Sequence, residues 1–146
     1  MRGTTAKSRR EWLQLRPWQR HSLVLAVAGI VYTIIGVVYL TIPLTADRAS
    51  ALQLALLLPI QLWGVIWIVT GCLAFASTRW PPQSTTWGYS ALAGLAALWG
   101  SSYLFGMLLL GTPHTALTGA LVWYLVAFLW WAISGLMNPD DVPKAG

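Results

Sequence analysis

Few residues in this sequence have types and spacings that could support chemistry. His21, His114 and the single cysteine, Cys72, are the side chains best suited to bind a metal or act as base or nucleophile. The two histidines flank different apolar segments, at positions that place them on opposite membrane faces, so they cannot share a metal ion. One cysteine excludes an intrachain disulfide and a cysteine-ligated cluster. We therefore expect Cys72 to be a small packing residue, with no metal and no cofactor.

A serine nucleophile is the one enzymatic alternative. The stretch "WGSSY" contains Ser101, and His114 could serve as its base. However, His114 falls in a turn beyond the helix end, and hydroxyls in membrane helices usually bond a carbonyl of their own helix. We expect no catalytic residue, and the Asp140-Asp141 pair near the end of the sequence is interpreted as a solvated terminus.

The elements that position these residues follow from the distribution of charge. Only 9% of the 146 residues are charged, and residues 21–46, 49–78 and 80–139 contain no Asp, Glu, Lys or Arg. A bilayer core of roughly 30 Å needs about 20 apolar residues per helix, so the first two stretches hold one crossing each and the third holds two. The sequence predicts an all-α, four-transmembrane-helix bundle with helices near 22–41, 52–76, 86–110 and 115–137. Pro59 is expected to kink the second helix.

Three regions result: a basic juxtamembrane segment (1–21), a transmembrane domain (22–137) and a short polar tail (138–146). Eight of the nine basic residues fall on one side of the four crossings, which predicts that both termini are cytoplasmic. The net charge of +5 indicates attraction to anionic lipid headgroups rather than nucleic acid. The arginines expected at the headgroups are Arg9, Arg10, Arg16 and Arg20.

Two further interpretations concern the N-terminal part of the chain. A cleaved signal peptide is possible in principle at "ASA" (49–51), but the apolar stretch is longer than a typical signal-peptide core. Ser8 and Glu11 form a capping-box pattern followed by Trp12 and Leu15, which favours a short amphipathic helix on the inner leaflet that ends at Pro17. A disordered basic tail is the alternative.

An internal repeat with a shift of 64 residues is the second organising feature. "GVVYL" at 36–40 corresponds to "GSSYL" at 100–104, and "WIVTG" at 67–71 corresponds to "WAISG" at 131–135. Small residues form one stripe on the first helix and another on the third, at identical spacing. The stripe residues are Ala26, Gly29, Thr33, Gly36, Ser90, Ala93, Ala97 and Gly100. The pattern predicts two parallel hairpin repeats in which the first and third helices meet through these stripes. The alternative is that small residues are simply common in such helices.

The predicted second and fourth helices carry most of the large rings: Trp63, Trp67, Trp123, Tyr124, Phe128, Trp130 and Trp131. We expect these rings to pack the bundle or to anchor it at the membrane interfaces, where Trp and Tyr are enriched. An aromatic pocket for a cation or an apolar ligand is the alternative. Trp12, Trp18, Trp80 and Trp87 are expected to form a belt at the cytoplasmic boundary.

No predicted crossing contains an ionisable carboxylate, lysine or arginine, which argues against a proton-coupled exporter. The basic head "KSRREWLQLRPWQR", the uncharged crossings and the tail "NPDDVPKAG" resemble the layout of the holins and other small membrane proteins of actinobacterial phages. The resemblance implies a non-enzymatic, homo-oligomeric protein of the host cell membrane that perturbs the bilayer. A superinfection-exclusion protein is an alternative within the same class.

A host-encoded bundle is the other class, either of a stress type or a small-molecule transporter. "GIVYTIIGVVYLTIP" followed by "WGVIWIVTG" resembles the hairpin repeat of the bacterial acid-resistance membrane family. The second hairpin departs from that pattern, because Met107 stands where the repeat has a proline.

Overall fold

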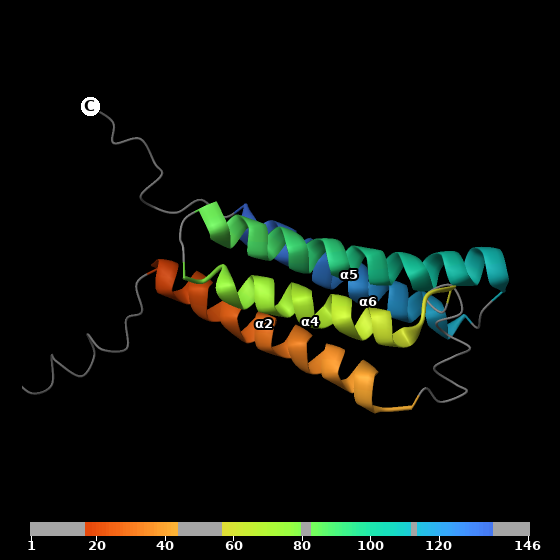
Figure 1. Ribbon diagram of the computed structural model, residues 1–146. Helices are drawn as coiled ribbons and strands as arrows, with labels where there is room; N and C mark the ends of the chain where they lie inside the picture. Colours follow the sequence, from red (N-terminus) through yellow and green to blue (C-terminus); the bar gives the residue numbers. More distant parts are fainter. Residues whose placement is uncertain (1–16, 44–56, 80–82, 112–113, 136–146) are drawn as a thin grey trace, which may run out of the picture.

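The computed structural model describes residues 17–43, 57–79, 83–111 and 114–135, with side-chain placement beginning at His21 in the first helix and at Thr85 in the third. Four α-helices make up this part of the chain. They are α2 (Pro17–Thr41), α4 (Ile60–Ala76), α5 (Gln83–Leu110) and α6 (Thr115–Ser134). Figure 1 shows them side by side, with successive helices running in opposite directions. The predicted all-α class is confirmed.

Three of the helices contain segments long and apolar enough to cross a membrane: His21–Thr41, Thr85–Leu110 and Thr115–Ser134. The helix α4 is also apolar, but it has 17 residues. At 1.5 Å per residue it extends about 25 Å, which is less than the roughly 30 Å of a bilayer core. The described residues therefore contain three candidate spans and one shorter apolar helix, and a fourth crossing stays a prediction.

The predicted kink at Pro59 is wrong. The helix α4 begins at Ile60, directly after Pro59, whose ψ of 135° is outside the helical range. A proline is well tolerated at a helix start, where its missing N–H leaves no helical hydrogen bond unmade. Leu57 and Leu58 precede the helix rather than belonging to it, and residues 52–56 of the predicted helix lie outside the described residues.

The other helix boundaries differ from the predicted ones by a few residues. The helix α2 starts at Pro17, five residues earlier than predicted, and α5 starts at Gln83, three residues earlier. The helix α6 ends at Ser134, and Gly135 caps it through N–H bonds to the Trp131 and Ala132 carbonyls. The proposed amphipathic helix at residues 8–15 and the polar tail lie outside the described residues.

The bundle consists of two closely packed hairpins. The helix α2 packs along α4, and α5 packs along α6, whereas contacts between the hairpins are fewer and lie mainly between α4 and α5. A Cβ atom added at Gly36 would lie 2.5 Å from the Gly64 carbonyl oxygen, and one added at Gly29 would lie 2.6 Å from the Gly71 carbonyl oxygen. Glycines therefore bring the α2 and α4 backbones into direct contact.

The prediction that the small-residue stripes join the first and third helices is wrong. Gly29 and Gly36 face α4, and a Cβ on Gly100 would lie 3.2 Å from the Ala120 carbonyl oxygen of α6. The helices α2 and α5 touch at few positions, because large rings separate them. Small residues thus serve the contacts within each hairpin, where two antiparallel neighbours approach closely.

The stripe residues differ in how deeply they are buried. Gly29, Gly36 and Gly100 are buried, whereas Ser90 is exposed on the outside of α5. The intermediate positions are Ala26, Thr33, Ala93 and Ala97. Gly29, Thr33 and Gly36 of the first stripe therefore pack against α4, while the third-helix stripe contributes chiefly through Gly100.

The 64-residue shift does not hold for α4 and α6, the second helices of the two hairpins. It pairs Trp67 with Trp131, yet Trp67 is fully buried and Trp131 is 67% exposed. Gly36 meets Gly64, whereas its counterpart Gly100 meets Ala120, because residues 42–59 connect the first hairpin and only residues 111–114 connect the second. A duplication of the hairpin stays a prediction. It requires that α6 packs on α5 in a different register from that of α4 on α2.

Candidate functional site: the aromatic seam between the hairpins

Aromatic rings fill the space where the two hairpins meet. We call this set the aromatic seam. Its members are Tyr32, Tyr39, Trp63, Trp67, Tyr89, Trp99, Trp123 and Trp130. All four helices contribute, so the seam is formed only when both hairpins are in place.

Trp67 lies at the centre of the seam and contacts the other three helices. Its ring centroid is 4.8 Å from that of Tyr32 on α2, 5.7 Å from that of Trp99 on α5, and 5.2 Å from that of Trp123 on α6. The contacts with Trp99 and Trp123 are T-shaped, a favoured geometry for aromatic pairs. Trp67 and Trp99 are both 0% exposed, so the rings close the middle of the bundle at this level.

A hydrogen-bonded network crosses the seam through Tyr32. The Tyr32 hydroxyl donates to the Leu92 carbonyl oxygen at 3.2 Å and accepts a hydrogen bond from the Trp130 Nε1 at 3.1 Å. One hydroxyl on α2 thus connects α5 and α6. Nearer the start of α2, the Tyr89 hydroxyl donates to the His21 carbonyl oxygen at 2.9 Å. These three bonds pin the register between the two hairpins.

Two buried hydrogen-bond donors in the seam are unpaired within the described residues. The Nε1 atoms of Trp67 and Trp99 are fully buried and have no hydrogen-bond partner among the described residues. Leaving a buried donor unpaired costs about 1–3 kcal/mol. The seam therefore combines a satisfied indole at Trp130 with two unsatisfied indoles at its centre.

The hydroxyl groups of the helices bond mainly to their own backbone, as expected from the sequence. Thr33 donates to the Gly29 carbonyl oxygen and Ser102 to the Trp99 carbonyl oxygen, at 2.8 and 2.7 Å. Ser101 donates to the Ala97 carbonyl oxygen at 2.8 Å, and its oxygen lies 2.9 Å from the Tyr124 hydroxyl. With Ser101 already donating, the Tyr124 hydroxyl is the donor of that second bond. Both partners of Ser101 are thus structural groups.

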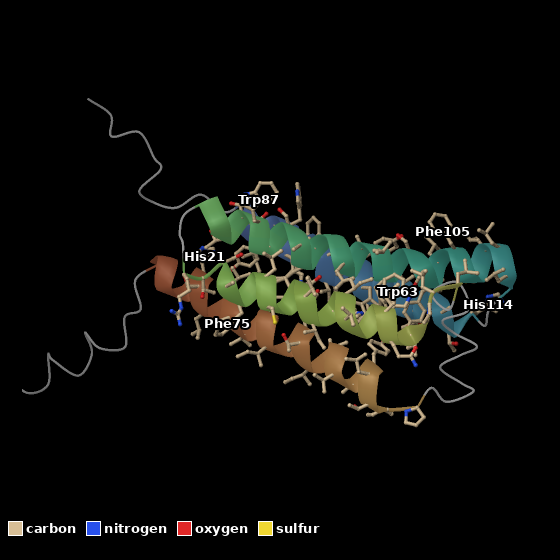
Figure 2. The ribbon with its side chains drawn as sticks, viewed as in Figure 1. His21, Trp63, Phe75, Trp87, Phe105 and His114 are labelled. Atoms are coloured by element: carbon tan, nitrogen blue, oxygen red, sulfur yellow. The ribbon has the colours of Figure 1, made fainter. Side chains whose placement is uncertain are left out.

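The candidate chemical residues are far apart in the bundle. Figure 2 shows His21 and His114 at opposite ends, as the sequence predicts. His114 is exposed and precedes the first turn of α6. Cys72 is exposed on α4, so its predicted role as a packing residue is wrong. It follows Gly71 by one position, about 100° round the helix from the face that meets α2. Within the described residues, no three His, Cys, Asp or Glu side chains are grouped to hold a metal ion.

The rings of α4 and α6 form a buried set and an exposed set. Trp63 and Trp67 are buried, and Trp123 and Trp130 are partly buried in the seam. Phe128 and Trp131 form an exposed ring pair on α6, with centroids 5.8 Å apart. The exposed rings also include Trp87 and Phe105, which point outward from α5 in Figure 2. The packing interpretation is confirmed for the buried set, and the exposed set fits contact with lipid.

Several residues expected at the membrane surface lie outside the described side chains. Arg9, Arg10 and Arg16 lie outside the described residues, and the described side chains of α2 begin after Arg20. Trp12 and Trp80 also lie outside them. Among the described side chains, Arg79 is the only charged group; it is exposed three residues after the end of α4. The headgroup contacts of the N-terminal arginines stay a prediction.

Comparison with known proteins identifies no relative. A scan against protein-family models finds no match, and searches of curated proteins and of solved structures find no significant match.

Proposed function

We propose that the protein is a non-enzymatic integral membrane protein that perturbs a bacterial cytoplasmic membrane in a holin-like manner when many copies assemble. Four crossings with both termini in the cytoplasm fit this role. The N-terminal arginines would then lie against the anionic headgroups of the inner leaflet.

One observation carries the proposal: the bundle is apolar on the outside and closed by rings on the inside. Large apolar side chains are exposed on every helix, including Val27, Ile30 and Ile34 on α2, Val65 and Val69 on α4, Leu98 and Phe105 on α5, and Leu121 and Leu125 on α6. Soluble monomers rarely expose apolar surface of this extent. Hydrocarbon is the environment that matches it.

The closed interior determines how such a protein could open a membrane. Trp67 and Trp99 fill the centre of the bundle, so a protein-sized passage cannot run through a single copy in this conformation. A large hole has to form between copies. Assembly from many copies depends steeply on concentration, so membrane damage should begin abruptly above a threshold amount of protein.

Controlled expression in a bacterial host tests the proposal. The protein is induced together with a muralytic enzyme that has no export signal, and culture turbidity and released enzyme are followed over time. We expect growth to continue until a threshold and then sudden lysis. The Gly36→Ala variant, which disrupts the α2–α4 contact, should delay or abolish lysis at equal protein level. Gly94→Ala, at a position with open space around it, is the matched control and should lyse on the normal schedule.

Two other outcomes would contradict the holin-like role. Cells that grow normally but resist phage infection would indicate superinfection exclusion. Cells with normal growth and normal phage sensitivity at high expression would exclude both phage functions and favour a host-encoded bundle.

A further inference from the structure

The two unpaired indole N–H groups form an unusual feature of the bundle centre. Trp67 comes from α4 and Trp99 from α5, so the two rings belong to different hairpins. Their centroids are 5.7 Å apart with an interplanar angle of 85°. Both side chains are 0% exposed, and both Nε1 atoms lack an acceptor among the described residues.

Three other donors of the seam do find acceptors. The Trp130 indole donates to Tyr32, and the hydroxyls of Tyr32 and Tyr89 donate to backbone carbonyls. Two neighbouring exceptions at the centre therefore indicate a shared cause. Buried polar groups that lack a protein partner are usually satisfied by an internal water molecule or an ion.

We propose that the centre of the aromatic seam is a binding site for a small neutral hydrogen-bond acceptor, namely water, held by the Trp67 and Trp99 indoles. The occupant must be small, because both rings are fully buried. It must be neutral, because residues 21–43, 57–79, 83–111 and 114–135 contain one charged side chain, Arg79, which is exposed three residues after the end of α4. An unpaired anion in this interior would carry a large desolvation penalty.

Ser102 supplies a further buried acceptor on α5, less than one turn from Trp99. It lies three residues after Trp99, on the same face of α5, and is 7% exposed. Its hydroxyl hydrogen is used by the Trp99 carbonyl oxygen at 2.7 Å, which leaves the oxygen lone pairs to accept a hydrogen bond. A bound water would accept hydrogen bonds from the two indoles and so bridge the two hairpins, and its own hydrogens could be donated to an acceptor such as the Ser102 oxygen.

Nuclear magnetic resonance of the full chain labelled with ¹⁵N at the tryptophan indoles tests this site. The sequence has ten tryptophans, and Trp67→Phe and Trp99→Phe assign the two relevant signals. The Trp130 signal provides an internal reference for a partly buried indole with a protein acceptor, and the Trp87 signal provides one for an exposed indole. We expect direct cross-relaxation with water at Trp67 and Trp99, and no such transfer at Trp130.

Two results would overturn the proposal. Indole protons shifted upfield without water cross-relaxation would show that each N–H points at an aromatic face, which the T-shaped contact permits. A saturable shift on titration with chloride would show that the occupant is an anion.

A second measurement stays informative if the phenylalanine variants misfold. The sulfur isostere of tryptophan, 3-benzothienylalanine, keeps the ring shape but lacks the N–H, and it can be placed at residue 67 or 99. If water accepts from the indole, the folding equilibrium constant should fall by up to about tenfold. An increase would mean that the native N–H is unsatisfied and would contradict the site. The same replacement at Trp131, which is 67% exposed, should have no effect.

Discussion

Gly36 lies where the backbones of α2 and α4 come closest, and its replacement by alanine gives a sharp test of the hairpin packing. The added Cβ would be 2.5 Å from the Gly64 carbonyl oxygen, 2.6 Å from Ile68 Cγ1 and 2.8 Å from the Ile68 backbone nitrogen. Ordinary contacts of a Cβ begin at 3.4 Å. Because two of these three atoms belong to the backbone, the helices have to separate by about 0.9 Å at this level.

The cost of this separation can be estimated by comparison with a second glycine. Overpacking a tight interface costs about 1–3 kcal/mol, whereas alanine stabilises a helix by roughly 1 kcal/mol relative to glycine. Gly94→Ala adds the same methyl group on α5, where nothing lies within 4 Å. The difference in unfolding free energy between the two variants therefore isolates the contact, and we expect Gly36→Ala to be less stable by about 1–3 kcal/mol.

The assay is reversible unfolding in mixed detergent micelles, with tryptophan fluorescence reporting the loss of the buried rings. Each variant is titrated with denaturing detergent, and the midpoint and slope give the free energy of unfolding. Equal stability of Gly36→Ala and Gly94→Ala would refute the close approach of α2 and α4 at Gly36.

Two further predictions concern threading and the seam. A phosphatase fused after His114 should be active, and one fused after Arg79 should be inactive; the opposite pattern would overturn cytoplasmic termini. Tyr32→Phe should destabilise the bundle by about 1–3 kcal/mol, because it leaves the partly buried Trp130 indole without its acceptor and the Leu92 carbonyl without the Tyr32 donor. Tyr124→Phe should cost less, about 0.5–1 kcal/mol, since Ser101 keeps its bond to the Ala97 carbonyl oxygen; equal losses measured by detergent unfolding would argue against the bridging role of Tyr32.

The elements of this fold could be predicted because charge and proline placement mark them strongly. The uncharged stretch after Arg20 and the adjacent prolines Pro81 and Pro82, which cannot continue a helix, indicate separate helices without any knowledge of packing. The helix on which each face packs was harder to predict. A stripe of small residues shows that a helix approaches another one closely, but it does not say which one. Gly29 and Gly36 meet α4 because two helices of one hairpin are held antiparallel and in reach of each other.

The seam was missed for a related reason. Tyr32 and Tyr39 follow Leu25 at intervals of seven, and Tyr89, Leu92 and Trp99 fall on one face of α5. This periodicity marks buried faces in α2 and α5, whereas the predicted packing of rings concerned α4 and α6. The hydrogen bonds of Tyr32 to α5 and α6 depend on helix register across the hairpins, and no spacing within one helix contains that information.

Leakage from liposomes of anionic lipid tests the proposed membrane perturbation most directly. Purified protein is reconstituted at increasing protein-to-lipid ratios, and the release of trapped fluorescent dextrans of several sizes is measured. We predict little release below a threshold ratio and then abrupt release of small and protein-sized dextrans together, because large holes form between assembled copies. Retention of all dextrans at every ratio, or graded release of the smallest alone, would contradict the account.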